Sequence, residues 1–292
     1  MKIIDVHIHF TDHEGFRETA RKAGHENSAE HLRREFERLG IVMAVAMGAG
    51  RGGDVDGLSV PRAVDLGGPF DPVRYGQPEF IAFCCGVESR TLTPENARRS
   101  AALFEPMLQM KQCVGIKLYP GYNRCYLADP IHHPFYELAE KYDVPVVIHT
   151  GDTASSNGIL KYAHPLTVDE VAVEFPRVRF VMAHYGNPWI VDATEVAAKN
   201  PNVFIDLSGL AVGKFEPREF FDHYRGYLDH IRTWIAYLSD YGKLMYGSDW
   251  PLVNLENYIE VVKSLIPADH HDEVFYQNAL RVFSKLVPLL PR

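Results

Sequence analysis

The sequence IIDVHIH, residues 3–9, sets a pattern that the rest of the chain repeats. It is short, largely apolar and β-branched, as strands are when both faces of their sheet are covered. Seven further stretches of this kind follow, at residues 42–47, 80–85, 115–118, 144–149, 178–183, 203–207 and 244–247. Amphipathic stretches separate them, at residues 31–39, 94–110, 134–142, 168–175, 188–199, 217–241, 255–266 and 270–286.

Eight strands alternating with helices predict a parallel sheet, because parallel strands need crossovers of about a dozen residues or more. These crossovers are right-handed, so eight consecutive units can close into a (β/α)8 TIM barrel, an α/β fold of about 250 residues. We therefore expect residues 1–292 to form a single TIM-barrel domain. An open doubly wound sheet is the alternative, but no strand is followed by a GxGxxG sequence. The Gly- and Pro-rich residues 50–78 are expected to form a long loop insertion after the second strand.

The charge and the apolar content of the chain exclude several classes of protein. The chain has 30 Lys and Arg against 38 Asp and Glu, and this net charge of −8 excludes a general nucleic-acid binder. The longest apolar run, which begins at Ile41, is far shorter than the ~20 residues of a membrane span, and the first residues are not a secretory signal. These features predict a cytoplasmic protein that binds neither nucleic acid nor membrane. The aromatic-rich residues 215–241 could support a homodimer, although packing within the helical core is the favoured explanation of them.

Five polar side chains fall at the carboxyl ends of the expected strands. His7 and His9 share one face of the first strand, because side chains alternate along a strand with a period of two. His149 ends the fifth strand, His184 follows the sixth and Asp249 follows the eighth. In a TIM barrel these ends converge on one rim, where active sites lie. Neutral imidazoles and a carboxylate suit a divalent transition metal, so we expect one ion, zinc by default, with manganese or iron as alternatives.

Five short motifs carry a family resemblance. They are DVHIHF at 5–10, VVIHTG at 146–151, VMAHYG at 181–186, YGSDWP at 246–251 and NALRVF at 278–283. In this order the set resembles the amidohydrolase superfamily, in its amidohydrolase-2 or decarboxylase-like branch, and the resemblance implies a metal-dependent TIM-barrel enzyme. By that resemblance the metal ligands would be His7, His9, His149 and Asp249. His184 would be the catalytic histidine or would support the metal ligands.

These residue types are sufficient for hydrolysis. A divalent ion lowers the pKa of a bound water toward about 7. Asp249 can then act as general base and afterwards as general acid, and His184 can hydrogen-bond the attacking water or the developing oxyanion. We therefore expect hydrolysis of an ester, lactone or amide. The same groups could instead protonate an aromatic or unsaturated carbon before carbon dioxide leaves, which makes a non-oxidative decarboxylase the alternative. A catalytically silent barrel used as a binding protein is the third hypothesis.

Further side chains are expected near the substrate. Lys117 ends the fourth strand, where it could contact a substrate carboxylate, pair with rim carboxylates or, as in some amidohydrolase relatives, be carboxylated and bridge two metals. Tyr119 and Arg124 lie on the loop that follows, and His164 lies on the loop after the fifth strand. Because a guanidinium binds carboxylates in a bidentate manner, we expect a small substrate that carries a carboxylate. Asp206, at the end of the seventh strand, could support the metal ligands.

Overall fold

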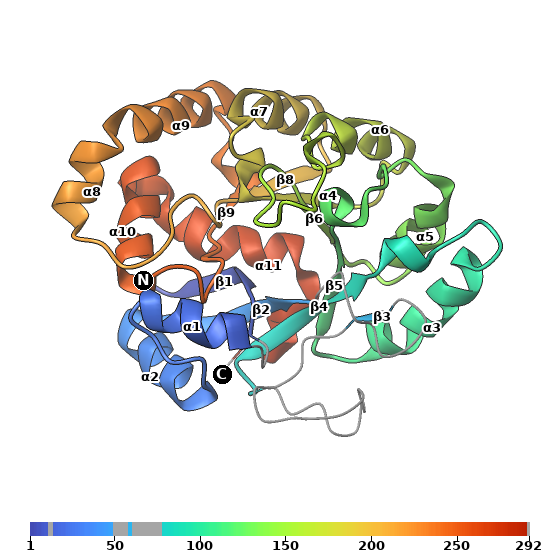
Figure 1. Ribbon diagram of the computed structural model, residues 1–292, viewed down its shortest axis with the longest axis horizontal. Helices are drawn as coiled ribbons and strands as arrows, with labels where there is room; N and C mark the ends of the chain where they lie inside the picture. The colour runs from blue at the N-terminus through green and yellow to red at the C-terminus, as the bar shows by residue number, and fades with distance from the viewer. Residues whose placement is uncertain (11–13, 49–57, 60–77, 291–292) are drawn as a thin grey trace.

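Eight parallel strands follow one another around a nearly closed barrel, in the order in which they occur in the chain (Figure 1). The structure is a computed structural model that describes residues 1–10, 14–48, 58–59 and 78–290. The barrel strands are β1 Ile3–Ile8, β2 Ile41–Met47, β4 Ile81–Val87, β5 Cys113–Leu118, β6 Val146–His149, β7 Phe180–Ala183, β8 Val203–Asp206 and β9 Leu244–Met245. A further strand, β3 (Leu58–Ser59), pairs antiparallel with β4. The predicted TIM barrel is confirmed.

Helices occupy the crossovers between the strands and surround the barrel. The longer ones are α1 Glu14–Lys22, α2 Ala29–Leu39, α3 Ala97–Gln109, α5 His133–Lys141, α6 Leu166–Glu174, α7 Ile190–Lys199, α8 Pro217–His223, α9 Arg225–Leu238 and α10 Leu255–Leu265. Two short helices are α4 Pro120–Asn123 and α11 Asn278–Val282. The α2 helix shows how local sequence sets the ends: the Ser28 side chain accepts a hydrogen bond from the His31 N–H, and Gly40 ends the helix with a φ of 76°.

Two helices differ from the sequence-based expectation. Residues 217–241 are predicted as one helix but form two, because Tyr224 takes φ −96° and ψ 17° and ends α8 where α9 begins. The α1 helix is not predicted at all. Of its residues only Ala20 is buried, and Phe16 is its one large apolar side chain, so the segment has too few apolar residues to be recognised as a helix.

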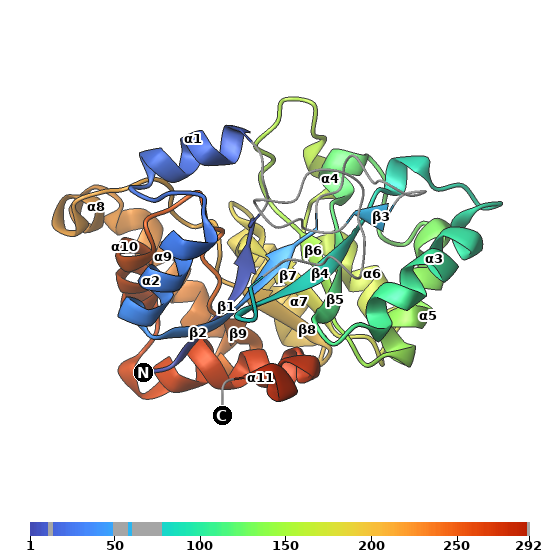
Figure 2. The ribbon, with the colours of Figure 1, turned by 90° about the horizontal axis from the view of Figure 1, so that it is seen from below.

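The barrel interior is an apolar core of its own, separate from the core between strands and helices. Residues after the last crossover, among them Val282, Phe283 and Leu286, pack into this inner core. The α11 helix thus lies across the end of the barrel at which the strands begin (Figure 2). The opposite end, where the strands finish, is where polar side chains gather.

The barrel closes between its first and last strands through backbone contacts. The Asp249 N–H donates to the His7 carbonyl at 2.8 Å, and the His9 N–H donates to the Trp250 carbonyl at 2.6 Å. Because these bonds lie at the carboxyl ends of the strands, they bring the histidines of β1 against the loop that carries Asp249.

Two expectations from the sequence, the loop insertion and the homodimer, concern features that the fold does not test. Residues 49–57 and 60–77, most of the expected insertion, lie outside the described residues. The homodimer stays a prediction. Within the described ranges, the structure contains no helix that is both long enough and apolar enough to cross a membrane.

The inner core provides a test of how the C-terminal segment contributes to stability. Leu286 is fully buried, whereas its neighbour Val287 is 56% exposed. We expect Leu286→Ala to lower the free energy of unfolding by about 2–5 kcal/mol, because it leaves a cavity in the core. Val287→Ala should change it by less than about 0.5 kcal/mol. Urea denaturation followed by circular dichroism measures both values, and similar losses for the two variants would contradict the packing of this segment into the barrel.

Candidate metal centre

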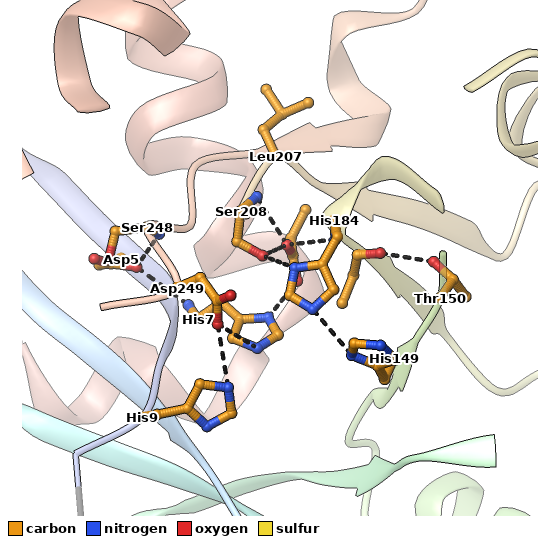
Figure 3. Close-up of polar contacts among 12 residues, drawn as sticks. Asp5, His7, His9, His149, Thr150, His184, Leu207, Ser208, Ser248 and Asp249 are labelled. Atoms are coloured by element: carbon orange, nitrogen blue, oxygen red, sulfur yellow. Dashed lines mark hydrogen bonds and ion pairs between the residues drawn. The ribbon is translucent and has the colours of Figure 1, made fainter. Parts of the chain in front are cut away.

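The strand-end side chains converge at the carboxyl end of the barrel (Figure 3). His7 belongs to β1, His149 ends β6, His184 directly follows β7 and Asp249 lies on the loop after β9. Each of the four exposes less than a tenth of its surface. The structure therefore places four polar groups from four different strands together, away from bulk water.

His7 is oriented by a buried carboxylate. Its Nδ1 lies 2.8 Å from Asp206 Oδ2, and both residues are fully buried. Burial raises the pKa of Asp206, but its interactions with His7 outweigh that effect, so the pKa is lowered and the group is an anion. An anionic carboxylate only accepts hydrogen bonds, so His7 Nδ1 carries the proton. His7 Nε2 then presents a lone pair, and among the described residues it has no hydrogen-bond partner.

His149 is oriented in the same sense by the backbone. Its Nε2 lies 2.7 Å from the Asp152 carbonyl oxygen, which can only accept, so Nε2 carries the proton and Nδ1 presents the lone pair. That Nδ1 lies 3.2 Å from His184 Nε2. Burial lowers the pKa of all three imidazoles, that of His7 to about 3, and this holds the rings in the neutral form that binds metals.

Asp249 supplies the negative charge of the centre. Its Oδ1 lies 3.1 Å from His9 Nε2 and 3.7 Å from His7 Nε2. Burial raises the pKa of Asp249, but its electrostatic interactions with His184 and His9 more than offset this, so the pKa is lowered. His9 is more exposed than the other groups, and its ring stacks on Phe16 with centroids 5.6 Å apart.

The backbone at the centre holds two residues in the left-handed region. His184 has a φ of 63° and Asp249 a φ of 62°. Such conformations cost about 1–3 kcal/mol for residues other than glycine and persist only when surrounding contacts impose them. Here the His184 N–H donates to Asp206 Oδ1 at 3.2 Å, and the Asp249 N–H donates to the His7 carbonyl. The strain aims both side chains at the same point.

A divalent cation fits this set of donors. His7, His184 and Asp249 offer ligand atoms that all lie within 4.8 Å of one another. Two nitrogens bound to one tetrahedral zinc ion are about 3.3 Å apart, close to the 3.2 Å between His149 and His184. His7 Nε2, which has no hydrogen-bond partner among the described residues, and the anionic Asp249 add two further groups that a cation would satisfy. Which of these donors bind the ion stays a prediction.

Lys117 is a buried lysine whose charge helps to lower the pKa of His7 and His149. It belongs to β5, is fully buried, and its Nζ has no hydrogen-bond partner among the described residues. The Nζ lies 5.0 Å from the centroid of the Tyr119 ring. Burial lowers the pKa of Lys117 to about 8, although the charges of Asp206 and Asp249 oppose this shift.

The other predicted substrate contacts lie in different surroundings. The Tyr119 ring lies 6.0 Å from that of His149 and so borders the centre. The exposed Arg124 donates from Nε and Nη2 to the Asn157 carbonyl, at 3.1 and 2.8 Å. His164 packs on Trp189 and lines a separate surface depression, to which none of the centre's histidines contributes. Their roles toward substrate stay predictions.

Sequence reasoning missed two contributors to the centre. Ser208 lies two residues after Asp206 and directly beside His184 (Figure 3). The Asp152 carbonyl is a backbone group, so no side-chain pattern could reveal its role. For Ser208 a signal existed, because residues two apart at a strand end share a face, the same argument that pairs His7 with His9.

Comparison with known families decides the relationship. The family model described as amidohydrolase matches residues 79–285, well over half of the chain. The chain belongs to the amidohydrolase family. Membership indicates a metal-dependent enzyme, a hydrolase or a decarboxylase. The match to the amidohydrolase model includes His149, His184 and Asp249 but not β1, so the placement of His7 and His9 depends on the geometry above. No curated protein matches the sequence.

Solved structures, some of them of amidohydrolases, share the fold. An uncharacterized TIM-barrel protein from Bordetella bronchiseptica is 21% identical, with a TM-score of 0.70 over 98% of this chain and 99% of that one. A zinc-bound amidohydrolase from Burkholderia multivorans is 17% identical, with a TM-score of 0.63 over the full length of both chains. A dihydroxybenzoic acid decarboxylase from a Polaromonas species, with bound manganese and an inhibitor, is 13% identical, with a TM-score of 0.60 over 97% of each chain.

Because the ammonium group of Lys117 is buried, we expect that removing its charge raises the free energy of unfolding. We expect Lys117→Met to raise the free energy of unfolding by about 1–3 kcal/mol at neutral pH, because methionine fills similar space without an unpaired charge. The pKa of Lys117 is about 8 in the folded state against 10.5 for an unperturbed lysine, so wild-type stability rises with pH between these values. The advantage of the variant should therefore shrink over this range.

Thermal unfolding of both proteins across this pH range measures the difference. Lys22→Met is the control, because Lys22 is exposed and pairs with Glu18 on the surface of α1. An advantage that is absent at neutral pH, or that grows as the pH rises, would contradict an unpaired buried charge at Lys117.

Proposed function

We propose that the chain is a metal-dependent hydrolase that acts on a small ester, lactone or amide carrying a carboxylate. The arrangement that supports this proposal is a set of buried imidazole lone pairs and one aspartate around a common point. Beside them lies a buried lysine whose Nζ has no hydrogen-bond partner among the described residues. His7 and His149 supply the imidazole lone pairs, Asp249 is the aspartate, and Lys117 is the lysine. Zinc is the metal we propose, with manganese as the alternative, because each is bound by a protein of the same fold.

Asp249 is the proposed general base. Its pKa is lowered, so it is ionised at neutral pH. Its Oδ1 lies at the centre, 3.1 Å from His9 Nε2, and has no hydrogen-bond partner among the described residues. It can accept a proton from a water molecule and return it to the leaving group. A bound divalent ion supplies Lewis acidity and lowers the pKa of water at such a site.

Lys117 is the proposed recognition group for the substrate carboxylate. Its ammonium is desolvated, and a buried cation interacts strongly with an anion that also leaves water. Because the pKa of Lys117 is about 8, the side chain is mainly protonated at neutral pH and can bind an anion. Tyr119 forms part of the wall beside it.

Non-oxidative decarboxylation is the second candidate. The observation in its favour is the shared fold with the dihydroxybenzoic acid decarboxylase, whose alignment covers 97% of this chain. An aromatic acid would present its carboxylate to the same cation. The two reactions differ in their products, since hydrolysis adds the elements of water and decarboxylation releases carbon dioxide.

The test begins with protein stripped of metal by a chelator and reloaded with Zn²⁺ or Mn²⁺. We expect turnover of carboxylate-bearing lactones, esters or amides only after reloading, with oxygen from labelled water appearing in the product. Release of carbon dioxide from aromatic acids without incorporation of labelled oxygen would favour the second candidate. Absence of bound metal and of both reactions would contradict the proposed function.

Two variants assign the roles. Asp249→Asn should lower kcat about 10²- to 10⁴-fold, because it removes the general base. Lys117→Met should raise KM for the carboxylate substrate more than for its methyl ester. Asp222→Asn, an exposed carboxylate on α8, is the matched control and should leave both constants unchanged. A loss in kcat no larger than that of the control would remove Asp249 from its role.

A further inference from the structure

Ser208 links the imidazole ring of His184 to the carboxylate of Asp206. It lies on the loop after β8 and is fully buried. Its Oγ lies 2.9 Å from His184 Nδ1 and forms a short hydrogen bond with Asp206 Oδ1 (Figure 3). The opposite oxygen of the same carboxylate, Oδ2, receives the Nδ1–H of His7. One carboxylate is therefore linked to two imidazole rings, one of them through a hydroxyl.

The direction of each hydrogen bond follows from the donors available. The Asp206 carboxylate is an acceptor only, and a serine hydroxyl has a single proton. Ser208 must therefore donate that proton to Asp206, and its oxygen can only accept from His184. His184 Nδ1 consequently carries a proton, and His184 Nε2 is the nitrogen left to face His149 Nδ1.

We propose that Asp206 and Ser208 are positioning residues that fix the tautomers of His7 and His184, the first directly and the second through the serine hydroxyl. The consequence is that both rings present the nitrogen that lacks a proton to the common point. A ring held in the other tautomer would aim an N–H at that point and could not act as a ligand there. The role of these tautomers in metal binding rests on the proposed function. The tautomers themselves follow from the hydrogen bonds alone.

The surroundings hold this relay in one geometry. The backbone N–H groups of His184 and Ser208 also donate to Asp206 Oδ1, at 3.2 and 3.0 Å. Gly209 follows with a φ of 69°, and a Cβ built on it would lie 2.7 Å from His184 Nδ1. Any side chain at this position would push the ring away from the serine. The close approach of loop and ring is thus part of how the proton is held on Nδ1.

The experiment measures the tautomers in metal-free protein labelled with ¹⁵N-histidine, at slightly alkaline pH. Long-range ¹H–¹⁵N correlation should show His184 Nδ1 protonated in the wild type. In Ser208→Ala the acceptor is lost, so the His184 proton should move to Nε2 in a measurable fraction of molecules. Zn²⁺ affinity, measured by competition with a chelator, should fall about 10- to 100-fold, as for other residues that orient metal ligands.

Conservative and control variants separate positioning from general damage. Ser208→Thr keeps the hydroxyl and should restore the wild-type tautomer and most of the Zn²⁺ affinity. Gly209→Ala leaves Ser208 intact but displaces the ring, and should weaken Zn²⁺ binding as Ser208→Ala does. Ser100→Ala removes a buried serine on α3, away from the centre, and should change neither property.

The inference would be overturned by a wild-type His184 that lacks the proton on Nδ1. A Ser208→Ala protein with unchanged tautomers and unchanged Zn²⁺ affinity would overturn it as well. Failure of the wild type to bind Zn²⁺ or Mn²⁺ would instead overturn the proposed function. Because the tautomers are read in metal-free protein, the positioning role is decided in either case.

Discussion

The buried carboxylate of Asp206 is the constraint on which the centre depends. A charge removed from water has to be matched by hydrogen-bond donors, and this one is matched from three separate strands. His7 comes from β1, the backbone of His184 follows β7, and Ser208 follows β8. Satisfying the carboxylate therefore fixes the carboxyl ends of these strands relative to one another. At this end of the barrel, the hydrogen bonds to Asp206 therefore determine both how the strands pack and where the polar groups lie.

The fold could be predicted so fully from the sequence because the barrel strands are apolar along their length and polar side chains follow where they end. Each barrel strand is an apolar run bounded by helix, and all eight runs predicted from the sequence are strands in the structure. The failures are local. The α1 helix has almost no buried face, and Tyr224 interrupts a continuous helical pattern through its backbone angles, which apolar periodicity does not encode.

The candidate site was predictable in its members but not in its connections. His7, His149, His184 and Asp249 could be placed together because strand ends meet at one rim. Hydrogen-bond direction depends on distances between strands that are remote in sequence, so neither the ring tautomers nor the role of Ser208 follows from spacing. Loop residues such as Arg124 are harder still. Its partner is a backbone carbonyl of another loop, a contact that sequence patterns do not specify.

The centre combines features that oppose stability. Lys117, whose Nζ has no hydrogen-bond partner among the described residues, and the left-handed backbone of His184 and Asp249 each lower stability. Their persistence in a barrel with a dense inner core is consistent with a site under functional demand. At the other end of the barrel, Leu286 packs into the inner apolar core and contributes stability there.

The contact between β1 and the loop after β9 has a consequence for how the molecule matures. His7 and Asp249 stand near opposite ends of the described chain, and each is held in place by a backbone bond to the other's segment. While the ribosome is still extending the middle of the chain, the nascent protein holds the histidines without the aspartate. A complete set of donors exists only once the last barrel strand has docked. A cation that requires all of these donors can bind only after that step.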